Sequence, residues 1–447
     1  MHRSFHKPNS TTTTTTRQKE ITMNMHTHQH VHQFPNVPTS LPAKGKLPED
    51  YRLGVYGWSF PVERIGEFIN VHGRRIKPML AMDINIPRDD FAEDVNSGKT
   101  PLEIMSLFAN NFPCPHGCAN CFNNAKLRNP VLRFDEVKNV IIQAKELGTE
   151  SSKFLGPGEL FANPRLFEIL DLFADLNIVF GIFTKGAILG NDMLSNRYLG
   201  INSDELVRRV TAYPNTTFLV GGRSFDPTFE NKLVPQNKRE VKETFDYHKS
   251  RNLAIERLCQ AGMNSDLARQ RLAIACAPVT ADNISGAFEI FIWGAERNIP
   301  VYLPPTMVSG KGRKFVAPAR DVNFENAYID LAVNVYVWAI KRGVVSLDCL
   351  LDKADGVHPY LGLVPCNQLT HGMYIHIDGS VRRCPGNDMP EFTIHSNVRE
   401  KPLIDIWTDS VNYRTNLFNN RCVKDGFSLP RRFYSEVFER VKKQLGD

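Results

Sequence analysis

The sequence lacks any long apolar run. Its longest apolar segment, LAVNVYVWAI at 331–340, includes Asn334 and is followed by Lys341 and Arg342, whereas a helix that spans a bilayer needs about 20 consecutive apolar residues. The amino terminus also lacks the apolar stretch of a secretory signal. We therefore expect no membrane span and a cytoplasmic protein whose cysteines stay reduced, which makes disulfides the weaker interpretation. Because residues 1–19 contain no acidic residue, a transit peptide stays an alternative.

A strong excess of charge of either sign is also missing. The 447 residues include 54 Lys and Arg against 48 Asp and Glu, a formal net charge of +6, and the first fifty residues supply half of that excess. The nearly neutral remainder lacks the basic surface that nucleic acids require, so we expect no nucleic-acid partner. With 42% hydrophobic residues, the chain can instead fold around a sizeable core, as one large domain with appendages.

Residues 1–48 have low complexity. Six threonines occupy 11–16, four histidines then alternate with other residues between 26 and 32, and several prolines follow. This composition predicts a disordered tail, and histidines on such a tail bind metal only adventitiously. We expect residues 49–104 to form an N-terminal extension, which contains the strand-like stretches LGVYGWSF and PMLAMDINIP.

From residue 105 on, strand-like runs alternate with amphipathic helical runs. The strand-like segments are 106–112, 153–156, 178–183, 217–222, 272–279 and 301–305. Six such alternations favour a parallel sheet with crossover helices. Because a closed barrel of this kind has eight units, the prediction is an α/β fold with a partial (β/α)6 TIM-like barrel at 105–320, followed by a bridging helix and linker at 321–360.

Polar loops follow the predicted strands. They are the cysteine loop NFPCPHGCANCFNN at 111–124, Gly156–Glu159, Thr184–Gly186, Arg223–Asp226 and Thr280–Asn283. The carboxyl ends of parallel strands meet at one rim of a barrel, where such folds place their chemistry. We therefore expect these loops to surround one site.

Three of the nine cysteines lie within eight positions of the first loop. Cys114, Cys118 and Cys121 have the spacing C-x3-C-x2-C and no fourth cysteine nearby. Thiolates in this arrangement can hold zinc or an iron-sulfur cluster. Structural zinc takes four protein ligands, so a set of three leaves one coordination position for an exogenous ligand. His116 is the alternative fourth ligand of a zinc site, although its place two residues after Cys114 on a tight loop is unfavourable.

This cysteine spacing, followed one βα unit later by Gly156–Glu159, resembles the radical S-adenosylmethionine (SAM) superfamily. The resemblance implies that Cys114, Cys118 and Cys121 hold a 4Fe-4S cluster, and that SAM binds the iron that lacks a protein ligand. It further implies reductive cleavage of SAM to a 5'-deoxyadenosyl radical, which abstracts a hydrogen atom from the substrate. An electron donor such as flavodoxin or ferredoxin is the partner that this chemistry implies.

The loops after the next strands resemble the SAM-binding segments of that family. Gly156 and Gly158 permit close approach of a ligand to the backbone, and Glu159 offers a carboxylate for an ammonium group. The resemblance implies the following SAM-binding set: Gly156, Pro157, Gly158, Glu159, Thr184, Lys185 and Ser224. Two positions depart from the family pattern, because Asn120 stands where an aromatic residue is usual and Lys185 where asparagine is usual.

The carboxyl-terminal part resembles the SPASM/twitch extension of many radical SAM enzymes. Cys366, Gly379 and Cys384 have the spacing of its opening, and residues 396–414 resemble its later segment. The segments 374–377 and 380–383 predict a hairpin with a two-residue turn, Asp378-Gly379. The remaining helix, residues 431–447, is predicted to serve packing.

The resemblance implies a small α+β extension at 361–430 with one auxiliary iron-sulfur cluster, held by Cys366, Cys384 and Cys422. The fourth ligand stays open between Asp425, Cys349 and an iron without a protein ligand, and Cys422 has the alternative role of a buried apolar residue. Cys259 and Cys276 are interpreted as packing residues, with hydrogen-atom donation as the alternative for Cys276.

For the whole protein we expect a radical SAM enzyme of oxidoreductase type. A small-molecule substrate such as a sugar, aminocyclitol or nucleoside is the first hypothesis, because residues 49–104 show no convincing helix pair of the kind that binds leader peptides. A maturase that modifies a peptide or protein side chain is the alternative. A non-catalytic iron-sulfur or zinc-binding protein is the alternative from another class.

Overall fold

The computed structural model describes residues 33–58, 64, 66–97, 114–123, 127, 129–351, 356–361, 366, 368–414 and 422–446. The predictions made for the histidine-rich segment and for a strand at 106–112 lie outside the described residues. All nine cysteines lie within them.

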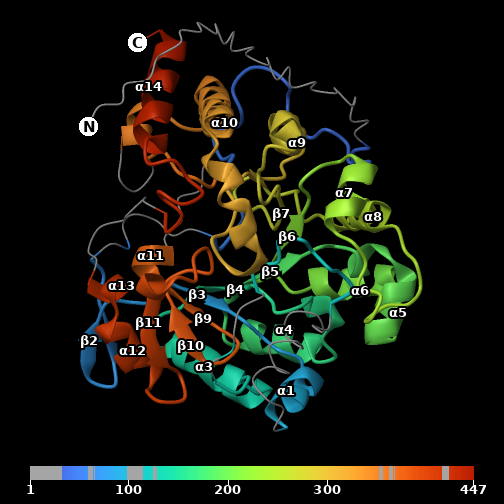
Figure 1. Cartoon of the computed structure of the whole chain (residues 1–447), viewed down its shortest axis with the longest axis vertical. Helices are drawn as coiled ribbons and strands as arrows, with labels where there is room; N and C mark the ends of the chain where they lie inside the picture. The colour runs from blue at the N-terminus through green and yellow to red at the C-terminus, as the bar shows by residue number, and fades with distance from the viewer. Residues whose placement is uncertain are drawn as a thin grey trace, which may run out of the picture. The chain divides into compact units, whose positions relative to one another are not determined.

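A nine-stranded sheet organises the described chain, in the order β11-β10-β9-β3-β4-β5-β6-β7-β8 (Figure 1). Its strands are β3 (Ala81–Ile84), β4 (Ser151–Phe154), β5 (Val179–Thr184), β6 (Thr216–Gly221), β7 (Leu272–Ala275), β8 (Val301–Tyr302), β9 (Gly372–Ile375), β10 (Ser380–Arg382) and β11 (Thr393–Asn397). Each neighbouring pair from β3 to β8 is parallel. This confirms the predicted α/β class with a partial (β/α)6 barrel.

Helices follow the strands as crossover connections. They are α1 (Asp89–Asn96), α3 (Phe134–Glu146), α4 (Leu166–Asp175), α5 (Asp192–Leu199), α6 (Ser203–Thr211), α7 (Pro227–Leu233), α8 (Tyr247–Gln260), α9 (Ile284–Ala295) and α10 (Val322–Lys341). In α3, for example, Val137, Val140, Ile141 and Ala144 recur at helical spacing and are buried, so one apolar face covers the sheet. Strands covered in this way are buried on both faces, as all four residues of β4 and of β7 are.

Short elements complete the described chain. They are β1 (Ile69–Val71), β2 (Arg74–Ile76), α11 (Gln368–His371), α12 (Leu403–Asp409), α13 (Val411–Arg414), α14 (Phe433–Leu445) and the 3-10 turns η2 (Leu160–Ala162), η3 (Ile188–Gly190), η4 (Gly310–Phe315), η5 (Pro318–Arg320), η6 (Asp348–Leu351) and η7 (Pro390–Phe392). Helix α14 lies beside α10 (Figure 1), and the two are joined by an ion pair of 2.7 Å between Arg440 and Asp330. None of the helices in the described part of the chain has the length and apolar character needed to cross a bilayer.

The start of the sheet differs from the prediction. Strand β3 lies inside the predicted N-terminal extension, yet it pairs in parallel with β4 on one side and with β9 on the other. Its four residues include Asp83, a buried carboxylate that pairs with Lys153 of β4 at 3.1 Å. The local pattern reveals a strand-like run, but the strand's place in the sheet depends on partners far away in the sequence.

The extent of the amino-terminal tail also differs from the prediction. Residues 33–48 are part of the folded body: Val37 and Leu41 are buried in the main core, and the backbone N–H of Gln33 donates to the Phe225 carbonyl at 2.7 Å. The Arg342 guanidinium donates to the carbonyls of Pro42 and Gly45. An irregular segment becomes ordered here because distant side chains satisfy its backbone groups, which composition alone does not reveal.

The predicted carboxyl-terminal hairpin forms with a different turn. Val381 pairs with Ile375 and Arg382 with Tyr374, and the connection is the three residues Ile377, Asp378 and Gly379 rather than two. Gly379 adopts a φ of 77°, as three-residue hairpin connections require. Since β9 pairs with β3, the hairpin and β11 continue the barrel sheet rather than forming a sheet of their own.

Candidate functional site

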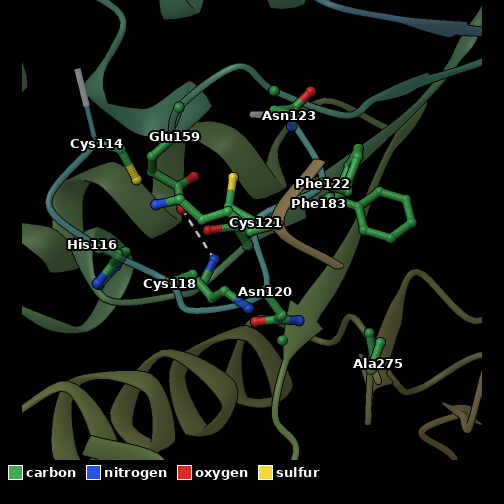
Figure 2. A pocket seen from close by; sticks show the side chains of 18 of the residues that line it. Cys114, His116, Cys118, Asn120, Cys121, Phe122, Asn123, Glu159, Phe183 and Ala275 are labelled. Atoms are coloured by element: carbon green, nitrogen blue, oxygen red, sulfur yellow. Dashed lines mark hydrogen bonds between the residues drawn. The ribbon is translucent and has the colours of Figure 1, made fainter. Parts of the chain in front are cut away.

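A cavity of about 600 Å³ opens at the rim of the barrel, at the carboxyl ends of the strands. Figure 2 shows Cys114, Cys121 and Glu159 around the same space. Among the described residues that line it are Cys114, His116, Cys118, Asn120, Cys121, Asn123, Gly156, Gly158, Glu159, Thr184, Lys185, Gln236, Lys238, Arg239, Ala275, Pro305 and Lys311. The structure thus brings together the cysteine loop and the loops after β4 and β5, as predicted.

Two segments that the sequence did not single out hold the cysteine loop in place. On one side, the Pro235 carbonyl accepts from the Gly117 N–H at 2.7 Å, and the Asn237 amide donates to the Cys114 carbonyl at 3.1 Å. On the other side, the Lys311 N–H donates to the Cys121 carbonyl at 2.9 Å. These segments contact the cysteine loop through backbone groups and one side-chain amide. Such contacts leave no motif in the sequence, which is why the sequence analysis did not identify them.

The three thiols of this loop lie close enough to influence one another electrostatically. Burial, together with the neighbouring Cys118, raises the pKa of Cys121 to about 11. Burial, Cys118 and Glu159 raise the pKa of Cys114 well above its ordinary value. The metal-free thiols of Cys114 and Cys121 therefore stay protonated at neutral pH, and a bound metal centre would be needed to stabilise their thiolates.

A zinc site completed by His116 finds no support in this geometry. Among the described residues, no group of three or more His, Cys, Asp and Glu side chains is arranged to hold a single metal ion. The His116 ring instead packs edge-on against Tyr247, with ring centroids 5.2 Å apart. Burial lowers the pKa of His116 to about 3, with a further contribution from Lys185.

The loop after β4 is shaped by two glycines. Gly156 and Gly158 have φ values of 90° and 80°, which L side chains rarely adopt. A Cβ on Gly156 would also lie 2.4 Å from the Asn123 amide nitrogen, and that amide donates to the Leu155 carbonyl at 2.6 Å. The glycines therefore let the loop close onto the cysteine segment.

Glu159 is the one carboxylate among the described residues that line the cavity. Its Oε2 accepts from the Lys185 N–H at 3.0 Å, while its buried Oε1 has no hydrogen-bond partner in the described part of the chain. Burial raises the pKa of Glu159 to about 7, against the opposing effect of hydrogen bonds from the Lys185 N–H, the Thr184 side chain and the Phe161 backbone. A buried, partly satisfied carboxylate is costly unless a cationic or donor group joins it.

The loop after β5 contributes Thr184, whose hydroxyl stabilises the loop, and Lys185, whose side chain lines the cavity. The Thr184 hydroxyl oxygen accepts from the Gly186 N–H at 2.9 Å, so it stabilises its own turn. The Lys185 side chain lies over Gly221, where a Cβ would be 2.8 Å from its Nζ. Pro157 and Ser224, which the resemblance also implied, are not among the described residues that line the cavity.

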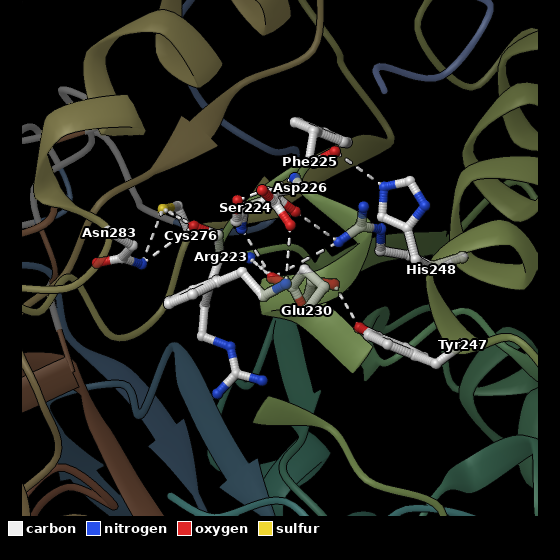
Figure 3. Close-up of polar contacts among 12 residues, drawn as sticks. Arg223, Ser224, Phe225, Asp226, Glu230, Tyr247, His248, Cys276 and Asn283 are labelled. Carbon is white, nitrogen blue, oxygen red and sulfur yellow. Dashed lines mark hydrogen bonds and ion pairs between the residues drawn. The ribbon is translucent and has the colours of Figure 1, made fainter. Parts of the chain in front are cut away.

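After β6 the predicted residues serve the loop itself, and a neighbouring residue faces the cysteine segment. The Ser224 hydroxyl accepts from the Asp226 N–H at 3.0 Å, and Asp226 caps α7 by accepting from the Phe229 N–H at 2.8 Å. Glu230, fully buried, accepts from the Ser224 N–H at 2.7 Å and lies 3.6 Å from Arg251. Figure 3 shows this network around Glu230.

Arg223 is the residue that the sequence prediction missed. Its guanidinium points away from Glu230 (Figure 3), and its Nη1 donates to the Asn120 side chain at 2.6 Å. Its buried Nη2 has no hydrogen-bond partner among the described residues. Asn120, the departure from the family pattern, thus orients an arginine beside the cysteine loop. The only sequence signal was an arginine directly after a strand.

The carboxyl-terminal thiols form a second group. Cys366, Cys384 and Cys422 lie close enough to affect one another, and burial raises the pKa of each thiol, to about 11 for Cys366. Around them lie the half-buried side chain of Tyr360 and the buried side chain of Lys424. Of the predicted fourth ligands, Cys349 instead contacts Ser346 at 3.1 Å.

The two remaining cysteines lie apart from both groups. Cys276 is buried with its sulfur 3.5 Å from the Arg223 carbonyl, and it does not line the cavity, although Ala275 and Ala277 do. Burial raises the pKa of Cys259, on α8, to about 12. Both cysteines therefore have the surroundings expected of packing residues.

Comparisons with known proteins find matches among solved structures. No protein-family model matches the chain, and no curated protein matches it. Among solved structures, SuiB from Streptococcus suis bound to S-adenosylmethionine is similar with a TM-score of 0.44 and 15% identity, over 76% of this chain and 68% of that one. SuiB bound to the precursor peptide SuiA is similar to the same degree, over 76% of this chain and 67% of that one. A truncated 3-deoxy-D-arabino-heptulosonate 7-phosphate synthase from Thermotoga maritima matches with a TM-score of 0.18 and 10% identity, over 85% of this chain and 93% of that one.

Proposed function

We propose that this protein is a radical SAM enzyme whose SAM-binding cluster is held by Cys114, Cys118 and Cys121. The observation that carries the proposal is the cavity that joins these three thiols to Glu159, a buried carboxylate with one oxygen unpartnered among the described residues. Three soft ligands without a fourth fit an iron-sulfur cluster better than structural zinc. The ligands of a 4Fe-4S cluster each bind a different iron, so they need not converge on one point as the ligands of a single ion do.

When bound, the cluster and SAM would together supply the electron transfer and the 5'-deoxyadenosyl radical that abstracts hydrogen. The role of the chain's own residues would be to bind and orient the cluster and SAM. Glu159 Oε1 would accept from the amino group of SAM, and the Lys185 ammonium would attract its carboxylate. Arg223 is not among the described residues that line the cavity, so its guanidinium beside Asn120 would add positive charge from behind the cysteine loop. Gly156 and Gly158 leave room for the ligand, and Ala275 and Ala277 form an apolar part of the cavity wall.

We also propose that Cys366, Cys384 and Cys422 hold an auxiliary cluster of the SPASM/twitch type. Their mutual proximity and burial support this, and the remaining three cysteines outside the first loop are placed elsewhere. A flavodoxin- or ferredoxin-type donor would deliver electrons to the protein.

The substrate class has two candidates. SuiB has been solved with its precursor peptide, which corresponds to the alternative of a peptide or protein substrate. The first hypothesis, a sugar, aminocyclitol or nucleoside, has no described residue that selects it. We therefore propose hydrogen abstraction as the reaction step and place peptide modification ahead of small-molecule oxidation as the substrate class to test.

The test is anaerobic reconstitution with iron and sulfide, followed by incubation with SAM and dithionite and measurement of 5'-deoxyadenosine. The wild-type protein should produce it, and a variant with Cys114, Cys118 and Cys121 changed to alanine should not, while the Cys366→Ala variant should keep the SAM-binding cluster. Zinc in place of iron at the first site, or iron without cleavage of SAM, would establish the non-catalytic alternative.

A further inference from the structure

The carboxyl-terminal thiols share their buried surroundings with a lysine that the proposed function has not used. Lys424 is 1% exposed, and its Nζ donates to the Pro305 carbonyl at 3.1 Å and lies 5.2 Å from the centre of the Tyr360 ring. All three thiols, Cys366, Cys384 and Cys422, are within its electrostatic reach.

Within the described part of the chain, no carboxylate pairs with Lys424. The contrast is Lys153, which is also buried near these thiols but is neutralised by Asp83 at 3.1 Å. Burial of an ammonium group without an opposite charge is strongly unfavourable. Burial lowers the pKa of Lys424, and the three thiols oppose that effect. Thiolates that hold a cluster would therefore be the anionic partner that keeps Lys424 charged.

The backbone is shaped so that the lysine and a thiol can meet. A Cβ on Gly386 would lie 3.1 Å from the Lys424 Cε and 3.3 Å from the Cys384 sulfur. The Gly386 N–H also donates to that sulfur at 3.3 Å. A side chain at position 386 would therefore separate the two groups.

We propose that Lys424 is the counter-charge of the auxiliary cluster and raises its reduction potential. This inference rests on the proposed auxiliary cluster. A 4Fe-4S cluster held by thiolates carries a net negative charge, and one-electron reduction by the donor makes that charge larger. A fixed cation in a low-dielectric site stabilises the reduced form more than the oxidised form. Since Asp83 and Lys153 neutralise each other, the positive charge beside the thiols comes from the buried Lys424 and from Arg383, which lies within electrostatic reach of Cys384.

The experiment isolates the auxiliary cluster in the full-length chain. Cys114, Cys118 and Cys121 are changed to alanine, so that the auxiliary cluster alone gives the EPR signal of the reduced protein. Lys424→Met is then compared with this parent by iron content and by potentiometric titration. We expect an about tenfold lower ratio of reduced to oxidised cluster at a given potential, which is a shift of about 59 mV to lower potential for a one-electron couple.

Two control variants distinguish the effect of the Lys424 charge from the effect of Lys424 packing. Lys401→Met removes an exposed lysine paired with Asp409 at 3.7 Å and should leave the potential unchanged. If Lys424→Met holds no iron, Lys424→Arg should restore both iron and potential, because it keeps the charge. Failure of Lys424→Arg to hold iron would show a packing role and overturn the inference.

Two further outcomes distinguish a failure of this inference from a failure of the proposed function. An unchanged potential in an iron-loaded Lys424→Met protein overturns the inference and leaves the proposed function intact. Absence of any cluster in the parent variant, together with SAM cleavage by the wild type, overturns the auxiliary cluster and the inference with it, but not the radical SAM activity.

Discussion

At the scale of single residues, the most informative feature is the Glu159 oxygen that has no hydrogen-bond partner among the described residues. A carboxylate that is buried with one oxygen unpartnered among the described residues is positioned to receive a donor group of a ligand. We predict that Glu159→Gln weakens SAM binding at least tenfold, since a hydrogen bond to a charged group contributes about 1.5–3 kcal/mol and about 1.4 kcal/mol is tenfold in affinity. Titration with SAM, followed by the change in the EPR spectrum of the reduced cluster, measures this.

The exposed Glu168 of α4 provides the matched control, because Glu168→Gln removes the same charge away from the cavity. Iron content should be the same in both variants. Unchanged SAM affinity in Glu159→Gln would contradict the assigned role.

Arg223 gives a second prediction at this scale. Its Nη1 is fixed by Asn120 and its Nη2 has no described partner, so Arg223→Met should lower SAM affinity by removing a charge, and Arg223→Lys should recover part of it. Recovery is expected to be partial because lysine lacks the planar fork that binds a carboxylate at two points. Equal affinities in wild type and Arg223→Met would show that Arg223 serves only the loop.

At the scale of elements, the loop that begins η4 supports the cysteine segment through its backbone. Gly310 has a φ of 51°, and a Cβ there would lie 2.4 Å from the Phe122 carbonyl oxygen and 2.8 Å from that of Cys121. Gly310→Ala should therefore displace the cysteine loop and lower the iron bound at the first cluster. Iron analysis and the EPR signal after reconstitution test this.

Gly200 is the matched control for this change. It ends α5 with a φ of 68°, and a Cβ at this position would have no described atom within 4 Å. Gly200→Ala therefore carries the backbone cost of a left-handed residue, about 1 kcal/mol, without the clash. If both variants lose iron equally, the effect of Gly310→Ala is one of general stability.

At the scale of the whole molecule, buried neutral histidines predict sensitivity to acid. Burial lowers the pKa of His116, His248, His358, His371 and His376, to about 4 for His371. The unfolded chain takes up these protons near pH ~6.5, so the stability present above that pH is lost as the pH falls toward the folded values. Asp83 and Glu159, whose pKa values burial raises, act in the opposite direction but are fewer.

We therefore predict that the metal-free protein is less stable at about pH 5 than at about pH 7, as measured by guanidinium unfolding. His371→Gln should reduce this loss by roughly 1–2 kcal/mol, and the same change at the exposed His395 should not. An identical pH dependence in wild type and His371→Gln would contradict the role of burial.

The sequence by itself determined the parts of this protein that depend on local pattern. Alternating strand and helix periodicity predicted the fold class and five of its six parallel strands, β4 to β8. The spacing of Cys114, Cys118 and Cys121 with Gly156–Glu159 predicted a shared site at the rim. These features can be predicted because the periodicity of an element and the spacing within a motif depend on residues that are close together in the sequence.

Only the tertiary structure decided the rest, because it depends on contacts between residues far apart in the sequence. It placed β3 in the sheet through β4 and β9, ordered residues 33–48 through distant side chains, and turned Arg223 rather than Ser224 toward the cysteine loop. The position of Lys424, buried beside three thiols and not paired with a carboxylate in the described part of the chain, likewise depends on the tertiary structure and is shown by no local pattern.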